Sequence, residues 1–264
     1  MGNQWDRTVD SSKDKYPNKG FIEEANRLCK EHGSFLAYLK TLEPIAQTRT
    51  CVNSDEYSAN INGVQVFIKT FARRLWPIRF FYGGHCIENE YMANAKIREK
   101  NLARVAMPYA MPRRDTAIFQ YIHNSGHLEN PRHHEDFAIP PRAFFQELID
   151  YIINLHKNGI CHGDIRRANI LVGEDGHPWL VDTASAYILP DKPNIIQRQF
   201  FKSLARSDMF SLAKIVFSYY PDWQDDTLKN AYENQSFLLK AARYAHYCFN
   251  ALLRRKKRKK KIKI

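Results

Sequence analysis

The sequence predicts an α+β fold of two lobes, and three observations support this prediction. Strand-like segments gather in the first half of the chain, and long helical segments gather in the second half. A cluster of polar residues follows the most regular helical segment and is flanked by short apolar runs. A strand-rich lobe joined to a helix-rich lobe leaves a cleft between them, which is a common place for a ligand to bind.

The N-terminal lobe is expected to contain an antiparallel sheet. A polar lead-in is followed by apolar residues at helical spacing up to Leu42, so residues 1–45 are predicted to be a partly helical extension. Three strand-like segments follow: Thr48–Val52, Tyr57–Ile61 and Val64–Lys69. Asn62-Gly63 between the last two is a strong hairpin signal. The N-lobe is therefore assigned to residues 46–124.

The N-lobe is expected to end with a helix over Cys86–Val105, stopped by Met107-Pro108, and a buried strand over Ala117–Ile122. The second lobe is expected to be mainly helical. It holds a helix opened by Pro140-Pro141 and ended by Gly159, and a helical region over Arg206–Leu253. The helix-rich lobe is assigned to residues 125–253.

Composition and charge exclude several classes of protein. No apolar run approaches the roughly 18–20 residues of a membrane span, and the N-terminus lacks the apolar core of a secretory signal. The five cysteines are scattered, which favours reduced thiols over a disulfide framework or a zinc site. We therefore expect a cytoplasmic protein. The net charge of +12 is mostly a tail at residues 254–264, because removing its nine basic residues leaves +3.

The residues that indicate chemistry lie between His162 and Ala184. Asp164 and Asn169 stand five residues apart, and Asp182 follows an apolar run. Phosphoryl transfer needs divalent metal to balance the phosphate charge, and Mg²⁺ prefers oxygen ligands such as carboxylate and amide. The acceptor hydroxyl also needs a carboxylate to orient it and take its proton. Asp164 suits the role of base, while Asn169 and Asp182 suit metal binding.

This segment resembles the catalytic and metal loops of the protein-kinase-like superfamily, whose usual forms are His-Arg-Asp-x-x-x-x-Asn and Asp-Phe-Gly. The resemblance implies a bilobal protein-kinase-like fold that uses ATP and Mg²⁺. It implies that Lys69, at the end of a strand, contacts the α- and β-phosphates and pairs with a helical glutamate. Glu90 is preferred to Glu88 for that pairing, because the apolar face begins directly behind it.

The resemblance also implies three further roles. The backbone of Gln120 and Ile122 would meet the adenine, as an inter-lobe hinge does. Arg166 stands where the family places its catalytic-loop lysine. Asp208 matches the helix aspartate that braces the catalytic loop, although a helix N-cap after Ser207 is an open alternative. His162 is expected to support the loop without taking part in chemistry.

The sequence departs from the family pattern in three places. Asn53–Glu56 holds no glycine where a phosphate-binding loop is expected. Gly163 replaces the usual arginine, and Asp182 is followed by Thr183-Ala184 in place of Phe-Gly. The last two changes remove a handle for a phosphorylated activation loop and a Phe switch. We therefore expect a site that is constitutively assembled.

The run from His162 to Leu171 with Val181–Ala186 resembles the bacterial lipopolysaccharide-kinase (Kdo/heptose kinase) group. That resemblance implies phosphorylation of a sugar hydroxyl of the lipopolysaccharide inner core, by a protein held peripherally on the inner face of the cytoplasmic membrane. The tail after Leu253 could bind an anionic membrane or simply be solvated. Nucleic acid is not an expected partner, because no aromatic residues interleave the tail charges.

Two alternative functions stay open. One is a Ser/Thr protein kinase of the same fold, for which Ser185–Lys202 offers little sign of a peptide-binding activation segment. The other is a non-catalytic, membrane-associated module that binds nucleotide.

Overall fold

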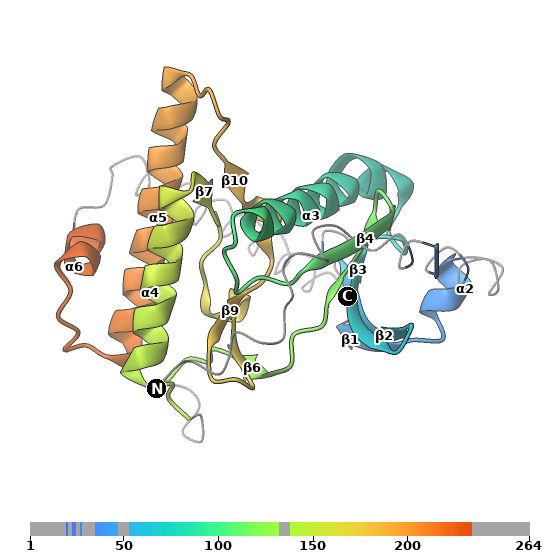
Figure 1. Ribbon diagram of the computed structural model, residues 1–264, viewed down its shortest axis with the longest axis horizontal. Coiled ribbons are helices and arrows are strands. Elements are labelled where there is room, and N and C mark those ends of the chain that lie inside the picture. The colour runs from blue at the N-terminus through green and yellow to red at the C-terminus, as the bar shows by residue number, and fades with distance from the viewer. Residues whose placement is uncertain are drawn as a thin grey trace, which may run out of the picture.

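The computed structural model describes residues 20, 23–24, 27, 35–46, 53–131 and 138–233. The predicted strand Thr48–Val52, most of the predicted helix before Phe35, and the basic tail lie outside these residues. Figure 1 shows two lobes, one built on a curved sheet and the other on long helices. The α+β bilobal prediction is thereby confirmed.

The N-lobe contains a five-stranded antiparallel sheet in the order β1-β2-β3-β5-β4. Its strands are β1 (Glu43–Ala46), β2 (Asp55–Ile61), β3 (Val64–Thr70), β4 (Pro108–Arg113) and β5 (Thr116–Gln120). Asn62 and Gly63 both adopt positive φ angles, of 53° and 79°, as a tight hairpin with a primed turn requires. This turn sets the register of β2 against β3, so that Glu56 lies opposite Lys69.

Helix α3 (Gly84–Glu99) packs beside the sheet, after a π-helical turn η1 (Ile78–Gly83). The predicted helix over Cys86–Val105 is too long, because Asn101 and Arg104 take positive φ angles that end helical geometry. Short helix α2 (Phe35–Leu39) adds Tyr38 and Leu39 to the core of the sheet.

The C-lobe is built on α4 (Arg142–Lys157) and α5 (Ile195–Tyr219), which lie side by side, with α6 (Asp226–Glu233) against α5. Their core includes Phe145, Leu148, Ile152, Leu212 and Val216. Three short strands, β6 (Asn124–His127), β8 (Ile170–Gly173) and β9 (Pro178–Leu180), form one sheet, and β7 (Ile160–Cys161) pairs with β10 (Tyr187–Ile188). Two 3₁₀ turns, η2 (Arg167–Asn169) and η3 (Thr183–Ser185), complete the loops that face the N-lobe.

Helix α5 begins well before the predicted start at Arg206. Asn194 caps it by accepting a hydrogen bond from the Gln197 N–H, and the Gln197 side chain accepts one from the Asn194 N–H. Asp208 therefore lies in the middle of the helix, and the N-cap alternative for Asp208 is wrong. Among the described residues, no helix combines the length and the apolar character needed to cross a bilayer.

Candidate active site

A cavity of about 730 Å³ lies between the two lobes. It is lined by all eight residues proposed from the sequence: Lys69, Glu90, Gln120, Ile122, Asp164, Arg166, Asn169 and Asp182. These residues come from β3, α3, the end of β5 with the residues that follow it, and the loops around β8 and β9. Positions up to 113 residues apart in sequence thus meet at one site.

Lys69 lies at the centre of a buried ionic cluster. Its Nζ is 2.7 Å from Glu90 Oε2 and 2.8 Å from Asp182 Oδ1. Burial opposes the charge of Lys69, but the two carboxylates outweigh burial and raise its pKa. The pKa of Glu90 is raised by burial, although Lys69 acts against that shift. The pKa of Asp182 is lowered, because Lys69 outweighs the effect of its burial. Lys69 is therefore positively charged and is fixed inside the cleft by two carboxylates.

The structure distinguishes the two candidate glutamates by helix phase. Glu90 is 5% exposed and faces Lys69, whereas Glu88 is exposed and lies 3.8 Å from Arg114. Each step along a helix turns the side chain by about 100°, so residues 88 and 90 point about 200° apart and cannot share one buried face. The ion pair forms with Glu90.

The predicted catalytic loop, residues 162–169, is held from beneath by Asp208. Its carboxylate accepts the N–H of His162 at 2.8 Å and the N–H of Gly163 at 3.0 Å. The buried His162 ring donates from Nε2 to the Val181 carbonyl at 3.2 Å, and its Nδ1 accepts the Asp164 N–H at 3.4 Å. Burial lowers the pKa of His162, which keeps the ring neutral for this pair of contacts. His162 thus lies in the loop and contacts its backbone.

Gly163 is required by the backbone at this position. Its φ angle is +80°, and a Cβ there would lie 2.3 Å from the carbonyl oxygen of Ser185. The departure from the usual His-Arg-Asp pattern therefore follows from how closely the loop after Asp182 packs on the catalytic loop.

Asn169 and Arg166 both orient Asp164. The Asn169 Nδ2 donates to the Asp164 carbonyl at 2.9 Å and to its Oδ2 at 3.1 Å. The Arg166 Nε lies 3.2 Å from Asp164 Oδ2 and donates to Asn169 Oδ1 at 3.2 Å, while its NH2 lies 3.7 Å from Asp182 Oδ2. One guanidinium therefore faces the three oxygen-bearing side chains expected to hold metal or a hydroxyl.

Asp182 adopts a left-handed backbone conformation, with φ 61° and ψ 56°. This conformation is uncommon for a residue with a Cβ and concentrates at functional sites, where surrounding contacts maintain it. Here the contacts come from the residues that follow Asp182 and from helix α3.

We use the name polar latch for Thr183, Asn94 and Asn89. The buried Thr183 hydroxyl donates to Asn94 Oδ1 at 2.7 Å, and Asn94 Nδ2 donates to the Ala106 carbonyl at 3.1 Å. Asn89 Nδ2 donates to the carbonyls of Ala184 and Ala186, at 2.7 and 3.0 Å. The polar latch ties the Asp182 loop to the helix that carries Glu90. Sequence reasoning missed it, because nothing local marks Asn89 or Asn94 as partners of a distant loop.

The hinge candidates lie on the cavity wall. The side-chain oxygen of Gln120 accepts hydrogen bonds from Arg98 NH2 at 3.0 Å and from the Met107 N–H at 3.2 Å, which fixes the end of β5. Asn124 Nδ2 donates to the Ile122 carbonyl at 2.7 Å. Strand β5 ends at Gln120, so Ile122 lies beyond the strand that was predicted to include it.

Glu56 is a cavity residue that the sequence did not single out for chemistry. It lies opposite Lys69 on β2, and burial raises its pKa. The hairpin turn at Asn62-Gly63 pairs Glu56 with Lys69 across the two strands, and that pairing could have identified Glu56 from the sequence. With Glu56 the cavity carries four carboxylates (Glu56, Glu90, Asp164, Asp182) against Lys69 and Arg166, a formal excess of two negative charges.

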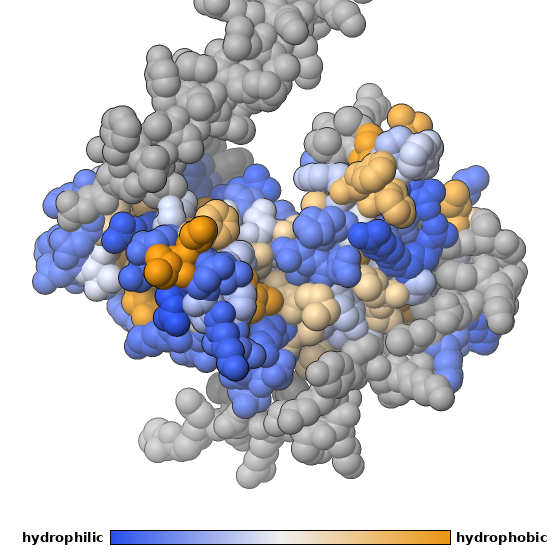
Figure 2. All heavy atoms as spheres, turned by 90° about the horizontal axis from the view of Figure 1, so that it is seen from above, coloured by the Kyte–Doolittle hydropathy of each residue, from blue (hydrophilic) through white to orange (hydrophobic). Residues whose placement is uncertain are grey.

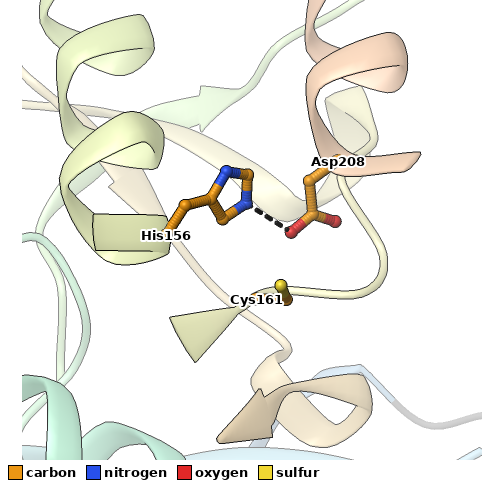
Figure 3. A group of neighbouring side chains, drawn as sticks. All are labelled: His156, Cys161 and Asp208. Carbon is orange, nitrogen blue, oxygen red and sulfur yellow. Dashed lines mark hydrogen bonds and ion pairs between the residues drawn. The ribbon is translucent and has the colours of Figure 1, made fainter. Parts of the chain in front are cut away.

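A second group of polar side chains lies beneath the catalytic loop and does not make a metal site. Figure 3 shows His156 of α4, Cys161 of β7 and Asp208 of α5 facing one another, with His156 Nε2 3.1 Å from Asp208 Oδ2. Both Asp208 oxygens already accept loop N–H groups, and the Cys161 thiol faces the Phe201 carbonyl at 3.6 Å. Burial raises the pKa of Cys161, which disfavours the thiolate that a metal requires. This group is structural.

The cleft fits a metal-bound nucleoside triphosphate. Asn169 and Asp182 offer the hard oxygen donors that Mg²⁺ prefers, and the excess of two carboxylates matches the charge of a divalent cation. Phe67, Phe119, Leu171 and Leu180 add apolar lining to the cavity, which suits a nucleotide base.

Comparisons with known proteins find short matches to protein kinases. No protein-family model matches the chain. The chain is 28% identical over 107 residues to CBL-interacting protein kinase 25 of Oryza sativa subsp. japonica, covering 36% of this chain and 20% of that protein. It is 27% identical over 120 residues to the serine/threonine-protein kinase AtPK1/AtPK6 of Arabidopsis thaliana, covering 41% and 25%.

It is also 43% identical over 47 residues to the serine/threonine-protein kinase rio2 of Schizosaccharomyces pombe, covering 18% and 13%. The matched segments span a quarter or less of the length of these three relatives. The bilobal fold, the grouping of the site residues and these distant relatives together support assignment of the chain to the protein-kinase-like superfamily.

Proposed function

We propose that the chain is a kinase that transfers the terminal phosphoryl group of ATP to a hydroxyl acceptor, with Mg²⁺. The observation that carries the proposal is the Lys69–Glu90–Asp182 ion cluster in one cleft with the Asp164–Asn169 pair. Bound Mg²⁺ supplies neutralisation of phosphate charge, held by Asn169 and Asp182.

Each residue has a distinct part in this proposal. Lys69 neutralises the α- and β-phosphates, and Glu90 holds Lys69 in place. Asp164 orients the acceptor hydroxyl and takes its proton. The backbone of Gln120 and Ile122 receives the adenine. Arg166 offers a second cation, and its exposed guanidinium can move from Asp164 and Asp182 to a phosphate once metal charge replaces it.

We propose that the acceptor is a sugar hydroxyl of the lipopolysaccharide inner core. The resemblance of His162–Leu171 to the lipopolysaccharide-kinase group motivates this choice. One structural observation supports a small acceptor over a peptide. Helix α5 begins at Ile195, soon after η3 ends at Ser185, and strand β10 occupies part of that interval. This leaves little chain for a segment that positions a peptide.

The second candidate is a Ser/Thr protein kinase, and it is favoured by the names of the distant relatives. A third is a non-catalytic module that binds nucleotide at a membrane. The proposed location is cytoplasmic and peripheral, at the inner face of the cytoplasmic membrane. The basic run Arg254–Lys261 supports it, since each basic residue near an anionic surface contributes about 1 kcal/mol of attraction.

The test offers ATP labelled at the γ-phosphate, with Mg²⁺, to three samples: inner-core glycolipid, a generic protein substrate, and no acceptor. The proposal expects label in the glycolipid, lost in Asp164→Asn and retained in Asp191→Asn, an exposed aspartate outside the cavity. Label in protein alone would exclude the sugar acceptor and support the second candidate. ATP binding without label in any acceptor would support the module.

A further inference from the structure

An exposed aromatic surface lies on the N-lobe, and only Tyr82 at its edge also lines the cavity described above. We use the name aromatic face for Leu75, Trp76, Phe80, Phe81 and Tyr82, which are between 48% and 75% exposed. They belong to the segment between β3 and α3, including η1. Burying such side chains releases about 25 cal/mol per Å² of apolar area, so leaving five exposed together is costly unless something covers them.

The aromatic face is held in a defined shape. The rings of Phe80 and Phe81 lie 5.1 Å apart edge to face, and Trp76 lies 6.3 Å from Phe81. Beneath them Arg79 is fixed to the buried Asp115 at 2.7 Å. Gly83 packs so tightly on Phe71 that a Cβ would lie 2.4 Å from its ring. The segment is therefore anchored to the lobe while its aromatic side chains face outward.

The exposed charged side chains around the aromatic face are mostly arginines. Asp55 and Asp115 are buried and paired with arginines. The exposed charged residues of segments 73–88 and 113–114 are Arg73, Arg113, Arg114 and Glu88. Arg114 also lies over the Phe80 ring, 5.2 Å from its centroid. Outward arginines around aromatic rings fit an anionic surface with an apolar interior.

Figure 2 shows apolar side chains gathered at two places on the same face of the molecule, over η1 with the start of α3 and over the start of α5. At the start of α5 the exposed large apolar side chains are Ile195, Ile196 and Phe200. Lys192, Arg198 and Lys202 are exposed among them, with Asp191 as the exposed acid of that stretch. The two lobes thus present similar chemistry toward the same side.

We propose that the aromatic face, together with the start of α5, is a docking surface for a bilayer that contains anionic lipid. Trp and Tyr are favoured at the boundary between headgroups and acyl chains, where Phe and Leu can enter the apolar layer. Arginines beside them meet the phosphate of the headgroups. A second copy of this chain fits less well, because a symmetric contact would bring two arginine-rich rims together. This inference does not rest on the proposed kinase activity.

Vesicle binding of the full chain tests the proposal. Sedimentation with phosphatidylcholine vesicles, with and without phosphatidylglycerol, is compared for the parent, Trp76→Ser/Phe81→Ser, and Ile139→Ser. The last is a matched control, an exposed apolar residue outside the aromatic face. The expected result is binding that needs phosphatidylglycerol and weakens about ten-fold or more in the double variant, while the control binds as the parent.

The emission of Trp76 gives a second measurement. Subtracting the spectrum of Trp76→Phe isolates this tryptophan, and its emission is expected to shift to shorter wavelength on anionic vesicles. Changing Arg254–Lys261 to glutamine measures the tail separately, and the shift at Trp76 should persist once enough lipid is added.

Three outcomes would overturn the proposal. In the first, the double variant binds vesicles as tightly as the parent and Trp76 emission is unchanged, so that all attraction belongs to the tail. In the second, the parent binds neutral vesicles equally well. In the third, Trp76→Ser/Phe81→Ser converts a dimer into a monomer without changing vesicle binding, which would assign the aromatic face to a second copy.

Discussion

The Thr183 hydroxyl and the Asn94 side-chain oxygen form a buried hydrogen bond of 2.7 Å, which joins the loop that carries Asp182 to the helix that carries Glu90. Both Asp182 and Glu90 contact Lys69, so this hydrogen bond closes a ring of contacts around the centre of the cleft. Thr183 stands at the position that the protein-kinase pattern Asp-Phe-Gly gives to Phe. A buried hydrogen bond with a fixed partner favours a single position of the loop.

Thr183→Val should show what the polar latch contributes. It keeps the shape of the side chain but leaves the buried Asn94 oxygen without its donor, which should lower the free energy of unfolding by about 1–3 kcal/mol. The phosphoryl-transfer rate should fall more than ATP affinity. The loop that carries Asp182 loses its anchor, whereas the proposed adenine contacts at Gln120 and Ile122 remain. Denaturant unfolding and steady-state kinetics measure the two effects. Thr183→Ser retains the hydroxyl and should behave nearly as the parent; an equal loss in both variants would contradict the latch.

The Lys69–Glu90 pair should separate stability from activity. Lys69→Met leaves Glu90 buried at 5% exposure without its cation, and we expect a loss of about 3–5 kcal/mol in the free energy of unfolding together with loss of phosphoryl transfer. Lys69→Met/Glu90→Leu removes both charges and should recover much of the stability but none of the activity. Thermal unfolding measures the stability of each variant, and labelled-ATP assays measure its phosphoryl transfer. Activity in the double variant would exclude a role for Lys69 in chemistry.

Gly163→Ala tests the close packing of the two loops. The φ angle of +80° alone costs an L-residue about 1–2 kcal/mol, and the added Cβ would also meet the Ser185 carbonyl at 2.3 Å. Gly176→Ala is a matched control, since Gly176 has φ +78° and nothing within 4 Å of its Cβ position. Gly163→Ala should therefore be clearly less stable than Gly176→Ala in urea. Equal midpoints would mean that the loops can separate at little cost.

His162 predicts a dependence of stability on pH. Burial places its folded-state pKa below the ordinary value of 6.5, so the unfolded chain binds more protons between these two values. Its contribution is complete above pH 6.5 and is lost as pH falls through the folded-state pKa, at up to about 1.4 kcal/mol per pH unit. Unfolding free energies measured from neutral to mildly acid pH should fall less steeply in His162→Gln. An unchanged slope would contradict a neutral buried ring.

The catalytic loop could be predicted from the sequence, because its residues lie close together along the chain. Asp164 and Asn169 are joined by a single 3₁₀ turn, so their spacing nearly fixes their geometry. Lys69 was found from its place at the end of an apolar strand. Glu90 was preferred to Glu88 because an apolar face begins directly behind it, and the structure places Glu90 beside Lys69. The chemical roles of these residues stay predictions.

Features that depend on contacts between distant segments could not be predicted. The polar latch joins positions about 90 residues apart, and an Asn on a helix looks the same whether it faces solvent or a buried loop. The start of α5 could have been found, because Asn194 and Gln197 have the spacing of a capping box. The aromatic face was missed, since hydrophobic residues in sequence are expected inside a protein and only the fold shows that these point outward.

The polar latch also has a consequence for inhibitor design. Compounds that block kinases by displacing a mobile Phe from beside the metal loop would find no such ring here, since residue 183 is a threonine hydrogen-bonded to Asn94. Cys86 also lines the cavity, but burial raises the pKa of its thiol, so the unreactive protonated form is favoured there. Selectivity at this cleft would therefore come from shape and polar contacts around Thr183 and Asn94 rather than from a covalent bond to Cys86.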